Sequence, residues 1–343
     1  MIREAIARLI ARESLSQDEA ATVMQEIMLG QATPSQIGAF LVALRMKQET
    51  AEEIAACAKV MRDHAIKVET KRHPLVDTCG TGGDGAGTFN VSTTVAFVVA
   101  GIGLAVAKHG NRSVSSRCGS ADVLEALGAQ IELDPDKIGR CLDEIGIGFL
   151  FAPRLHPAMK YAAAPRREIG IRTIFNLLGP LTNPASASIQ LVGVYDPALT
   201  ETVAQVLSLL GIRSALVVHG AGGLDELSTM GASKVTQLKE SNITTYYLDP
   251  QDLGLPLAQP SSIQGGLPAD NARIMMGLLQ GEKGAKRDMV LLNAAAALLA
   301  AEKVATFKEG LALAAESIDS GRALDKLEEF IDLSRSLGCG SGT

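Results

Sequence analysis

The stretch LVDTCGTGGDGAGTFNVSTTVAFVVAGIGLAVAKHG, residues 75–110, contains two short apolar runs separated by a glycine-rich loop and a longer apolar segment. The runs LVDT and GLAVAKH begin an alternation between β-branched runs and segments of helical pattern. This alternation continues through four later runs, namely GIGFLFA, SIQLVGVY, SALVVHG and NITTYYL. Short strands that alternate with helices are typical of an α/β fold with a mostly parallel central sheet flanked by helices.

The loop DTCGTGGDGAGTFN, residues 77–90, has more glycines than a turn requires. Glycine lets the backbone adopt positive φ angles and approach a ligand closely, so that successive N–H groups can bind one anion. Gly80, Gly82 and Gly85 fit the pattern G-x-G-x-x-G, but the next run ends in Lys108, where a Rossmann site needs an acidic residue. No G-x-x-x-x-G-K-[ST] motif occurs either. We therefore expect a phosphate site of another kind.

Residues 1–70 lack the short β-branched runs found in the rest of the chain and are predicted to form four helices. Three helix starts have capping-box patterns, in which a Ser or Thr is followed three residues later by Glu or Gln: Ser16–Glu19, Thr33–Gln36 and Thr50–Glu53. This part of the chain lacks glycine loops and polar clusters suited to chemistry. We therefore expect it to be a small all-helical domain that packs against a second copy of itself.

The remaining chain is predicted to form a larger α/β domain from residues 74–160 and 186–343. Between these two parts, the segment 160–185 is rich in Arg, Asn and Pro and interrupts the alternation of strands and helices. We expect this segment to pack back onto the helical domain.

The composition excludes several classes of protein. The chain has 343 residues, of which 47% are hydrophobic, and its net charge of −6 comes with scattered Lys and Arg, which disfavours a nucleic-acid surface. Its longest apolar runs are broken by glycine and small polar residues, so a membrane protein is not expected. Five cysteines without C-x-x-C spacing and the absence of a signal segment suggest a cytoplasmic protein.

The loops that follow three predicted strands carry the polar residues, at 78–93, 108–120 and 220–228. Ligands of parallel sheets bind at the carboxyl ends of strands. In the first loop, Asn90, Ser92 and Thr93 can be both helix caps and anion contacts. The second loop is rich in hydrogen-bond donors, namely Lys108, His109, Asn111, Arg112, Ser115, Ser116, Arg117 and Ser120. Ser120 also precedes a predicted helix, so capping and phosphate binding are equally favoured for it.

The third loop places Asp225 beside Glu226 after a strand and a glycine turn. Adjacent carboxylates that bridge Mg²⁺ to phosphate oxygens explain such a pair, although an exposed acidic pair is the ordinary alternative. No G-x-S-x-G, H-E-x-x-H or zinc spacing occurs. Cys79 and Cys118 have no histidine tied to them by a motif, and we expect buried thiols. We therefore expect no protein nucleophile, and catalysis by electrostatic stabilisation of a departing phosphorylated group.

Together the motifs resemble the anthranilate phosphoribosyltransferase family over essentially the whole chain. The resemblance rests on GTGGD (80–84), NVST (90–93), KHGNRSVSSRCGSADVLEALG (108–128), RTIFNLLGPLTNPA (172–185) and DELS (225–228). It implies the nucleoside phosphorylase and class IV phosphoribosyltransferase type of fold, and a homodimer formed through the helical domain. It also implies transfer of the ribosyl 5-phosphate group from phosphoribosyl pyrophosphate to the amine of anthranilate, the second step of tryptophan biosynthesis from chorismate. The expected mechanism is dissociative.

The resemblance assigns roles to individual residues. It implies that phosphoribosyl pyrophosphate contacts Gly80, Gly83, Asp84, Thr88, Asn90, Val91, Ser92, Thr93, Lys108, His109, Gly110, Asn111, Arg112, Ser115, Ser116 and Ser120. It implies two Mg²⁺ ions held by Ser92, Asp225 and Glu226. Anthranilate is expected to contact Gly80, Asn111 and Arg166, with His109 and Pro180 as neighbours.

The acceptor side is where the sequence departs from the family. Tyr161 stands where many relatives carry histidine, and Pro165 precedes Arg166. The choice of Arg166 over Arg167 rests on the resemblance alone. Two other functions agree less well with the sequence. A pyrimidine nucleoside phosphorylase is disfavoured by the Asp225–Glu226 pair and by KHGNR, and a nucleic-acid-binding relative without catalysis is disfavoured by the net charge.

Overall fold

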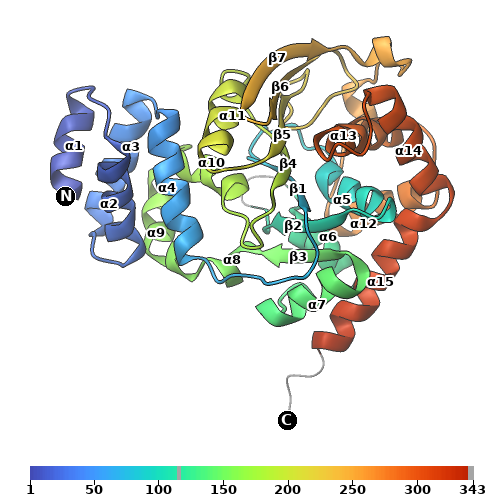
Figure 1. The fold of residues 1–343 in the computed structure, drawn as a ribbon, viewed down its shortest axis with the longest axis horizontal. Coiled ribbons are helices and arrows are strands. Elements are labelled where there is room, and N and C mark those ends of the chain that lie inside the picture. Colours follow the sequence, from blue (N-terminus) through green and yellow to red (C-terminus); the bar gives the residue numbers. More distant parts are fainter. Residues whose placement is uncertain (114–116, 339–343) are drawn as a thin grey trace.

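The computed structural model describes residues 1–113 and 117–338, and begins with a group of four helices. These lie together at one end of the molecule (Figure 1): α1 (Ile2–Ile10), α2 (Gln17–Met28), α3 (Pro34–Lys47) and α4 (Ala51–His64). The three predicted capping boxes are all formed, at the starts of α2, α3 and α4. The prediction of a four-helix N-terminal region is therefore confirmed.

The rest of the chain is built on one sheet of seven strands in the order β3-β2-β1-β4-β5-β6-β7. The strands are β1 (Leu75–Gly80), β2 (Ala105–Gly110), β3 (Ile147–Phe151), β4 (Ile189–Gly193), β5 (Ser214–His219), β6 (Ser233–Lys239) and β7 (Asn242–Leu248). Every pairing from β3 to β5 is parallel, and among the described strands β6 pairs antiparallel with both β5 and β7. A mostly parallel sheet was predicted, but β6 was missed because the apolar residues of SKVTQLK, Val235 and Leu238, are three positions apart and do not alternate with polar ones.

Helices cover both faces of this sheet (Figure 1). In chain order they are α5 (Val91–Gly101), α6 (Ser120–Ala126), α7 (Pro135–Ile145), α8 (Ala152–Leu155), α9 (Lys160–Ile169), α10 (Ile174–Leu181), α11 (Leu199–Leu209), α12 (Pro268–Leu279), α13 (Ala285–Ala300), α14 (Phe307–Asp319) and α15 (Arg322–Gly338). Short 3₁₀ turns lie at Pro157–Met159, Pro250–Leu253 and Pro260–Ile263. None of the described helices is both long enough and apolar enough to cross a bilayer.

Alternation along the strands divides the core between the two faces. Leu216 and Val218 of β5 pack with α5 and α13 in one apolar cluster. Ala215 and Val217 belong to a second cluster, which includes α11 and the N-terminal helices. Successive side chains of a strand point to opposite faces, so both faces are buried, as is typical of a parallel sheet.

The segment 160–185 lies between the N-terminal helices and the sheet. Helix α9 contacts α2 and α3, and α10 contacts α3 and α4. Ile174, Phe175 and Leu178 of α10 share one apolar cluster with α1–α4 and with α11. The segment therefore extends from the helical region to the edge of the sheet. The domain boundaries drawn from the sequence remain a prediction.

Candidate functional site

The loops that follow β1 and β5 meet at one edge of the sheet, although β4 lies between these two strands. Asp225 of the β5 loop lies across the end of β4, where a methyl group on Gly193 would overlap the Asp225 backbone. The absence of a side chain at Gly193 therefore lets the acidic loop reach the glycine loop. A methyl group on Gly80 would likewise overlap the Asp225 carboxylate.

The glycine loop is held against the acidic pair. The Gly82 N–H donates to Oδ2 of Asp225 at 2.7 Å, and the Ala86 N–H donates to Oδ1 of Asp84 at 3.0 Å. Gly82 and Gly83 have φ angles of 66° and 75°, which other residues rarely adopt. The conformation that the sequence predicts for this loop is therefore present.

Asp225 and Glu226 lie in an electrostatic environment that suits a cation. Burial, helped by the charge of Asp84, raises the pKa of Asp225 to about 7. Burial and the charge of Asp225 raise the pKa of Glu226, whose Oε1 accepts the Ser92 N–H at 3.1 Å. Among the described residues no group of three or more His, Cys, Asp or Glu side chains is arranged to hold a metal. A cation here would need substrate or water oxygens to complete its coordination.

Lys108 brings positive charge to the same place from the end of β2. Its side chain is buried, and its Nζ donates to the Thr78 carbonyl at 2.5 Å and lies 3.5 Å from Ser92 Oγ. It forms no ion pair with any described carboxylate. A buried ammonium without a paired carboxylate is a suitable contact for a phosphate oxygen.

The start of α5 adds backbone donors. Asn90 occupies the N-cap position, but its side chain makes no capping hydrogen bond. Its amide instead donates to the Cys118 carbonyl at 3.2 Å, and its Oδ1 accepts from Asn271 at 2.8 Å. The capping alternative is therefore wrong for Asn90, which ties the first two loops together. Val91 and Thr93 are buried, and Thr88 forms an isolated bridge with Gln264.

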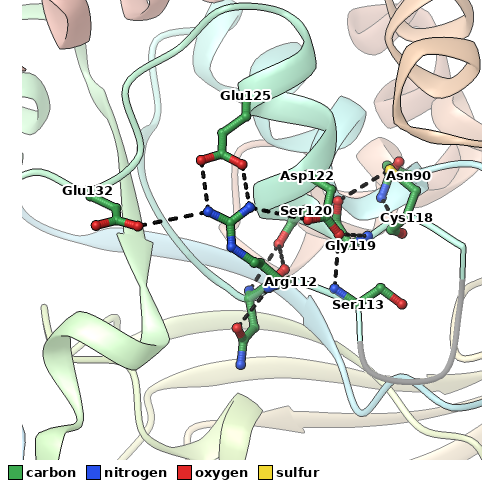
Figure 2. A network of polar contacts seen from close by, with 10 residues as sticks. Asn90, Arg112, Ser113, Cys118, Gly119, Ser120, Asp122, Glu125 and Glu132 are labelled. Atoms are coloured by element: carbon green, nitrogen blue, oxygen red, sulfur yellow. Dashed lines mark hydrogen bonds and ion pairs between the residues drawn. The ribbon is translucent and has the colours of Figure 1, made fainter.

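Figure 2 shows the second loop, where the Arg112 guanidinium faces the acidic side of α6. Its Nη2 donates to Glu125 Oε1 at 2.8 Å, and further ion pairs join Arg112 to Asp122 and Glu132. Asp122 also accepts the N–H groups of Ser113 and Gly119, at 3.0 and 2.8 Å. The Arg112 side chain is thus engaged in holding the loop to α6. Its predicted phosphate contact remains a prediction, and Ser115 and Ser116 lie outside the described residues.

Ser120 fixes the other side of this loop. Its Oγ accepts the Asn111 N–H at 3.2 Å and lies at the same distance from the Asn111 carbonyl. The N-cap of α6 is Gly119, so Ser120 does not cap the helix. A methyl group on Gly110 would overlap Ser120 Oγ. The Ser120 hydroxyl and the absence of a side chain at Gly110 therefore allow a close turn that positions Asn111.

The residues expected on the acceptor side lie on the segment 160–185 and at the end of β2. Arg166 is half-buried, its Cζ lies 5.0 Å from the Phe175 ring centroid, and no hydrogen bond or ion pair joins it to any described residue. Burial lowers its pKa. Arg167, by contrast, is exposed. The structure therefore distinguishes two arginines that the sequence alone could not separate, and Arg166 is the one available to a buried carboxylate.

His109 lies beside a second buried histidine. Its Nδ1 is 3.2 Å from the Gly179 carbonyl, whereas its Nε2 has no partner among the described residues. The ring centroids of His109 and His156 are 5.2 Å apart, and burial lowers their pKa values to about 3 and about 4. Both rings are therefore neutral at pH 7, and they provide an uncharged surface that can still form hydrogen bonds.

Comparison with known proteins agrees with this arrangement. Residues 72–324 match the family model "Glycosyl transferase family, a/b domain", and residues 3–65 match "Glycosyl transferase family, helical bundle domain". The anthranilate phosphoribosyltransferase of Moorella thermoacetica is 60% identical over 331 residues, covering 96% of this chain and 98% of that protein. The chain belongs to the anthranilate phosphoribosyltransferase family.

Solved structures of anthranilate phosphoribosyltransferases superpose over nearly the whole chain. The enzyme from Thermus thermophilus has a TM-score of 0.92 and 45% identity, covering 96% of this chain and 99% of that one. The enzyme from Saccharomyces cerevisiae, solved in complex with phosphoribosyl pyrophosphate and Mg, has a TM-score of 0.89 and 31% identity, with 98% of each chain covered.

Some residues that shape this member of the anthranilate phosphoribosyltransferase family were not predicted. Asp77 is fully buried, and its carboxylate accepts the His109 N–H at 3.2 Å and the Asn183 amide at 2.8 Å. An aspartate inside an apolar run was the available signal. Gly193, inside the run SIQLVGVY, was another, because glycine within a strand marks a close approach of other backbone.

The cysteines agree with the expectation of buried thiols. Cys79 and Cys118 are buried thiols, and burial raises the pKa of Cys118 to about 11. Burial also raises the pKa of Cys79. Thiols with raised pKa values are protonated at pH 7 and poorly nucleophilic. The two cysteines therefore offer no nucleophile at this anthranilate phosphoribosyltransferase site.

Proposed function

We propose that this chain transfers the 5-phosphoribosyl group of phosphoribosyl pyrophosphate to the amine of anthranilate, giving N-(5-phosphoribosyl)anthranilate and pyrophosphate. The observation that carries this proposal is the meeting of the glycine loop, Lys108 and the Asp225–Glu226 pair at one edge of the sheet. Backbone donors, a buried ammonium and crowded carboxylates are the groups that a magnesium diphosphate requires. Family membership then selects this reaction, the second step of tryptophan biosynthesis.

The donor is expected to lie across the start of α5. Gly80, Gly83 and Asp84 would contact the pyrophosphate and ribose, together with Asn90 and the backbone of Val91. The same side of the donor site would include Thr88, Ser92 and Thr93. The opposite side would consist of the residues at and after the end of β2, namely Lys108, His109, Gly110, Asn111, Arg112, Ser115, Ser116 and Ser120. The start of α5 supports this placement, because the Asn90 side chain makes no capping hydrogen bond and the helix dipole favours an anion there.

Magnesium is expected at Ser92, Asp225 and Glu226, with two ions for each active site. The raised pKa of Asp225 supports this assignment, since carboxylates crowded together in a buried site are stabilised by a divalent cation. Such an ion neutralises charge that develops on the departing pyrophosphate. Asp225 and Glu226 would hold it, and the Ser92 N–H bond to Glu226 already orients one of these carboxylates.

Anthranilate is expected to pair its carboxylate with Arg166, near Gly80 and Asn111. The planar guanidinium can donate two parallel hydrogen bonds to a carboxylate. Neutral His109 and the adjacent Pro180 would line the aromatic ring. The same yeast relative has been solved in complex with 4-fluoroanthranilate, which supports a binding site for such an acid in this fold.

The bond changes need no protein nucleophile. The bond from ribose C1 to the pyrophosphate oxygen breaks, the anthranilate nitrogen forms the new bond to C1, and that nitrogen loses one proton. C1 becomes oxocarbenium-like between these events. The chain's contribution is alignment of two substrates and stabilisation of charge by donors that are already in position.

The decisive experiment follows anthranilate fluorescence after purified protein is mixed with phosphoribosyl pyrophosphate and Mg²⁺. We expect a rapid decay that stops when EDTA is added or when Mg²⁺ is omitted. Uridine or thymidine with inorganic phosphate serves as the control for nucleoside phosphorylase activity. A folded protein that leaves anthranilate unchanged but cleaves a nucleoside would overturn the proposed acceptor.

The helical region is proposed to form the interface of a homodimer. Ile10 of α1 and Met46 of α3 are 70% and 63% exposed, and α1 packs directly on α3. Apolar side chains this exposed, on neighbouring helices, are suited to burial against a second copy.

A further inference from the structure

Arg172 lies in the short link between α9 and α10, and it contacts the donor loop from the acceptor-bearing segment. Its side chain is exposed, yet its Nη2 donates a hydrogen bond to the carbonyl of Gly83. The two residues are 89 positions apart in the chain. The contact therefore joins the segment that carries Arg166 to the loop proposed to bind pyrophosphate.

The guanidinium is itself held in place by an aromatic ring. Its Cζ lies 4.1 Å from the centroid of Tyr195, just beyond β4. Stacking of a guanidinium on an aromatic face is attractive and fixes the plane of the side chain. Tyr195 thereby limits the directions in which Arg172 can donate.

Tyr195 holds the glycine loop at a second point. Its N–H donates to Thr81 Oγ1 at 3.1 Å, while the Thr81 N–H donates to the Gly193 carbonyl at 2.9 Å. Arg172 and Tyr195 therefore hold Gly83 and Thr81, on either side of Gly82. The Gly82 N–H in turn donates to Asp225. The first half of the loop is fixed at three successive residues.

Holding one carbonyl determines where the next N–H points. In a trans peptide the C=O of one residue and the N–H of the next are directed to opposite sides. With the Gly83 carbonyl held toward Arg172, the Asp84 N–H is directed away from Arg172. Gly83 has a φ of 75°, so this loop depends on an external contact more than on side-chain sterics for its orientation.

We propose that Arg172, stacked on Tyr195, is a positioning residue of the donor site, which fixes the glycine loop through the Gly83 carbonyl. It sets the direction of the loop's backbone donors before phosphoribosyl pyrophosphate binds. The inference rests on the proposed function for the identity of this ligand. It adds a role for a residue outside the predicted set of ligand contacts.

The test compares Arg172→Gln with Arg167→Gln, a matched change at an exposed arginine of α9. Binding of phosphoribosyl pyrophosphate with Mg²⁺ is measured by calorimetry, without anthranilate, and the KM of each substrate is measured by turnover. We expect Arg172→Gln to weaken donor binding about tenfold, the loss of one charge-assisted hydrogen bond, and to raise the donor KM similarly. The anthranilate KM and the Arg167→Gln variant should stay within about twofold of wild type.

Variants of Tyr195 test whether its ring acts on donor binding through Arg172. Tyr195→Leu should weaken donor binding like Arg172→Gln, Tyr195→Phe should not, and the Arg172→Gln/Tyr195→Leu double variant should be no worse than either single change. Additive losses, or an unaffected Tyr195→Leu, would show that Tyr195 does not act through Arg172 and would overturn the proposal.

Two further outcomes would also overturn it. One is that Arg172→Gln binds the donor as tightly as wild type. The other is that Arg172→Gln raises the anthranilate KM but not the donor KM. Arg172→Lys is used if the Gln variant loses its thermal unfolding transition. Calorimetry does not depend on the acceptor. If wild-type protein binds the donor but leaves anthranilate unchanged, the proposed reaction is wrong. The role of Arg172 is then still tested by donor binding.

Discussion

At the scale of single residues, the acidic pair gives the sharpest prediction. Replacing both Asp225 and Glu226 with alanine should abolish Mg²⁺-dependent turnover, because no other described carboxylate pair is placed at this site. The fold should persist. Burial disfavours the charged form of Asp225, whose pKa is about 7, so its removal should not lower stability at pH 8. Turnover and the thermal unfolding midpoint are measured together, and full activity in the double variant would remove the metal assignment.

Arg166 gives a second prediction. Arg166→Ala should raise the anthranilate KM by about tenfold or more, because a bidentate charge-assisted contact is lost, while the donor KM stays close to wild type. Arg167→Ala is the control, since that side chain is exposed. An unchanged anthranilate KM in Arg166→Ala would place the carboxylate contact elsewhere.

The two buried histidines predict a pH dependence. Their folded pKa values of about 4 and about 3 lie below the ordinary value of 6.5, so the unfolded chain binds more protons in acid. The contribution of neutral His156 is complete above about pH 6.5 and is lost as the pH falls toward 4. The unfolding free energy of wild type minus that of His156→Phe should therefore decrease from pH 7 to pH 5. A constant difference in urea unfolding would contradict this.

Much of the site follows from the sequence because its chemistry lies in local patterns. Glycine spacing predicted the loop with positive φ angles, and Asp225 beside Glu226 predicted a crowded acidic pair. Other features depend on packing. The burial that sets Arg166 apart from Arg167 comes from packing against Phe175, and the contact of Arg172 with Gly83 joins segments far apart in the chain. No local pattern reports such contacts.

At the scale of elements, Glu53 connects α4 to the end of α3 and to the link between α1 and α2. Its buried carboxylate accepts the N–H groups of Leu15 and Thr50, each at 2.8 Å, and pairs with Lys47 at 2.6 Å. Glu53→Ala leaves the ammonium and both N–H groups without their partner. It should cost about 3–5 kcal/mol, as expected for a broken buried ion pair.

The exposed neighbour Glu52 provides a control for this change on the same helix turn. Glu52→Ala should alter stability by less than about 0.5 kcal/mol. Urea unfolding followed by circular dichroism measures both variants. Equal stabilities would show that the Glu53 contacts contribute little beyond the capping of α4.

The elements themselves were predictable to different degrees. The capping boxes at Ser16, Thr33 and Thr50 locate three helix starts, because the Ser or Thr side chain and the Glu or Gln three residues later both act within one turn. Strand β6 was missed because it lies antiparallel near an edge, where polar side chains are tolerated. Its identity as a strand depends on its neighbours β5 and β7.

At the scale of the whole molecule, the order of the strands determines the site, and the sequence does not show that order. Strand β4 follows β3 in the chain by way of the segment 160–185, but it pairs with β1. This insertion brings α9 and α10 beside the loops that follow β1 and β2. The segment proposed to bind anthranilate and the loops proposed to bind phosphoribosyl pyrophosphate therefore meet because of topology, although they are separate motifs in the sequence.

The proposed dimer is the prediction that belongs to this scale. Ile10 and Met46 lie on neighbouring helices, and Arg12, which follows Ile10 closely, donates to the Met46 carbonyl at 2.8 Å. A carboxylate buried in an apolar interface is strongly unfavourable. We therefore expect Ile10→Glu/Met46→Glu to have the 35.9 kDa mass of one chain by light scattering, and wild type to have twice that mass.

Leu267 provides the matched control for the dimer. It is 62% exposed at the start of α12, away from the helical region, so Leu267→Glu should leave the mass of the dimer unchanged. Monomeric wild-type protein would rule out the homodimer at the concentration used. A dimer that survives the double change but not Leu267→Glu would move the interface to the α/β region. Turnover in a folded monomeric variant would then show that each site is complete within one chain.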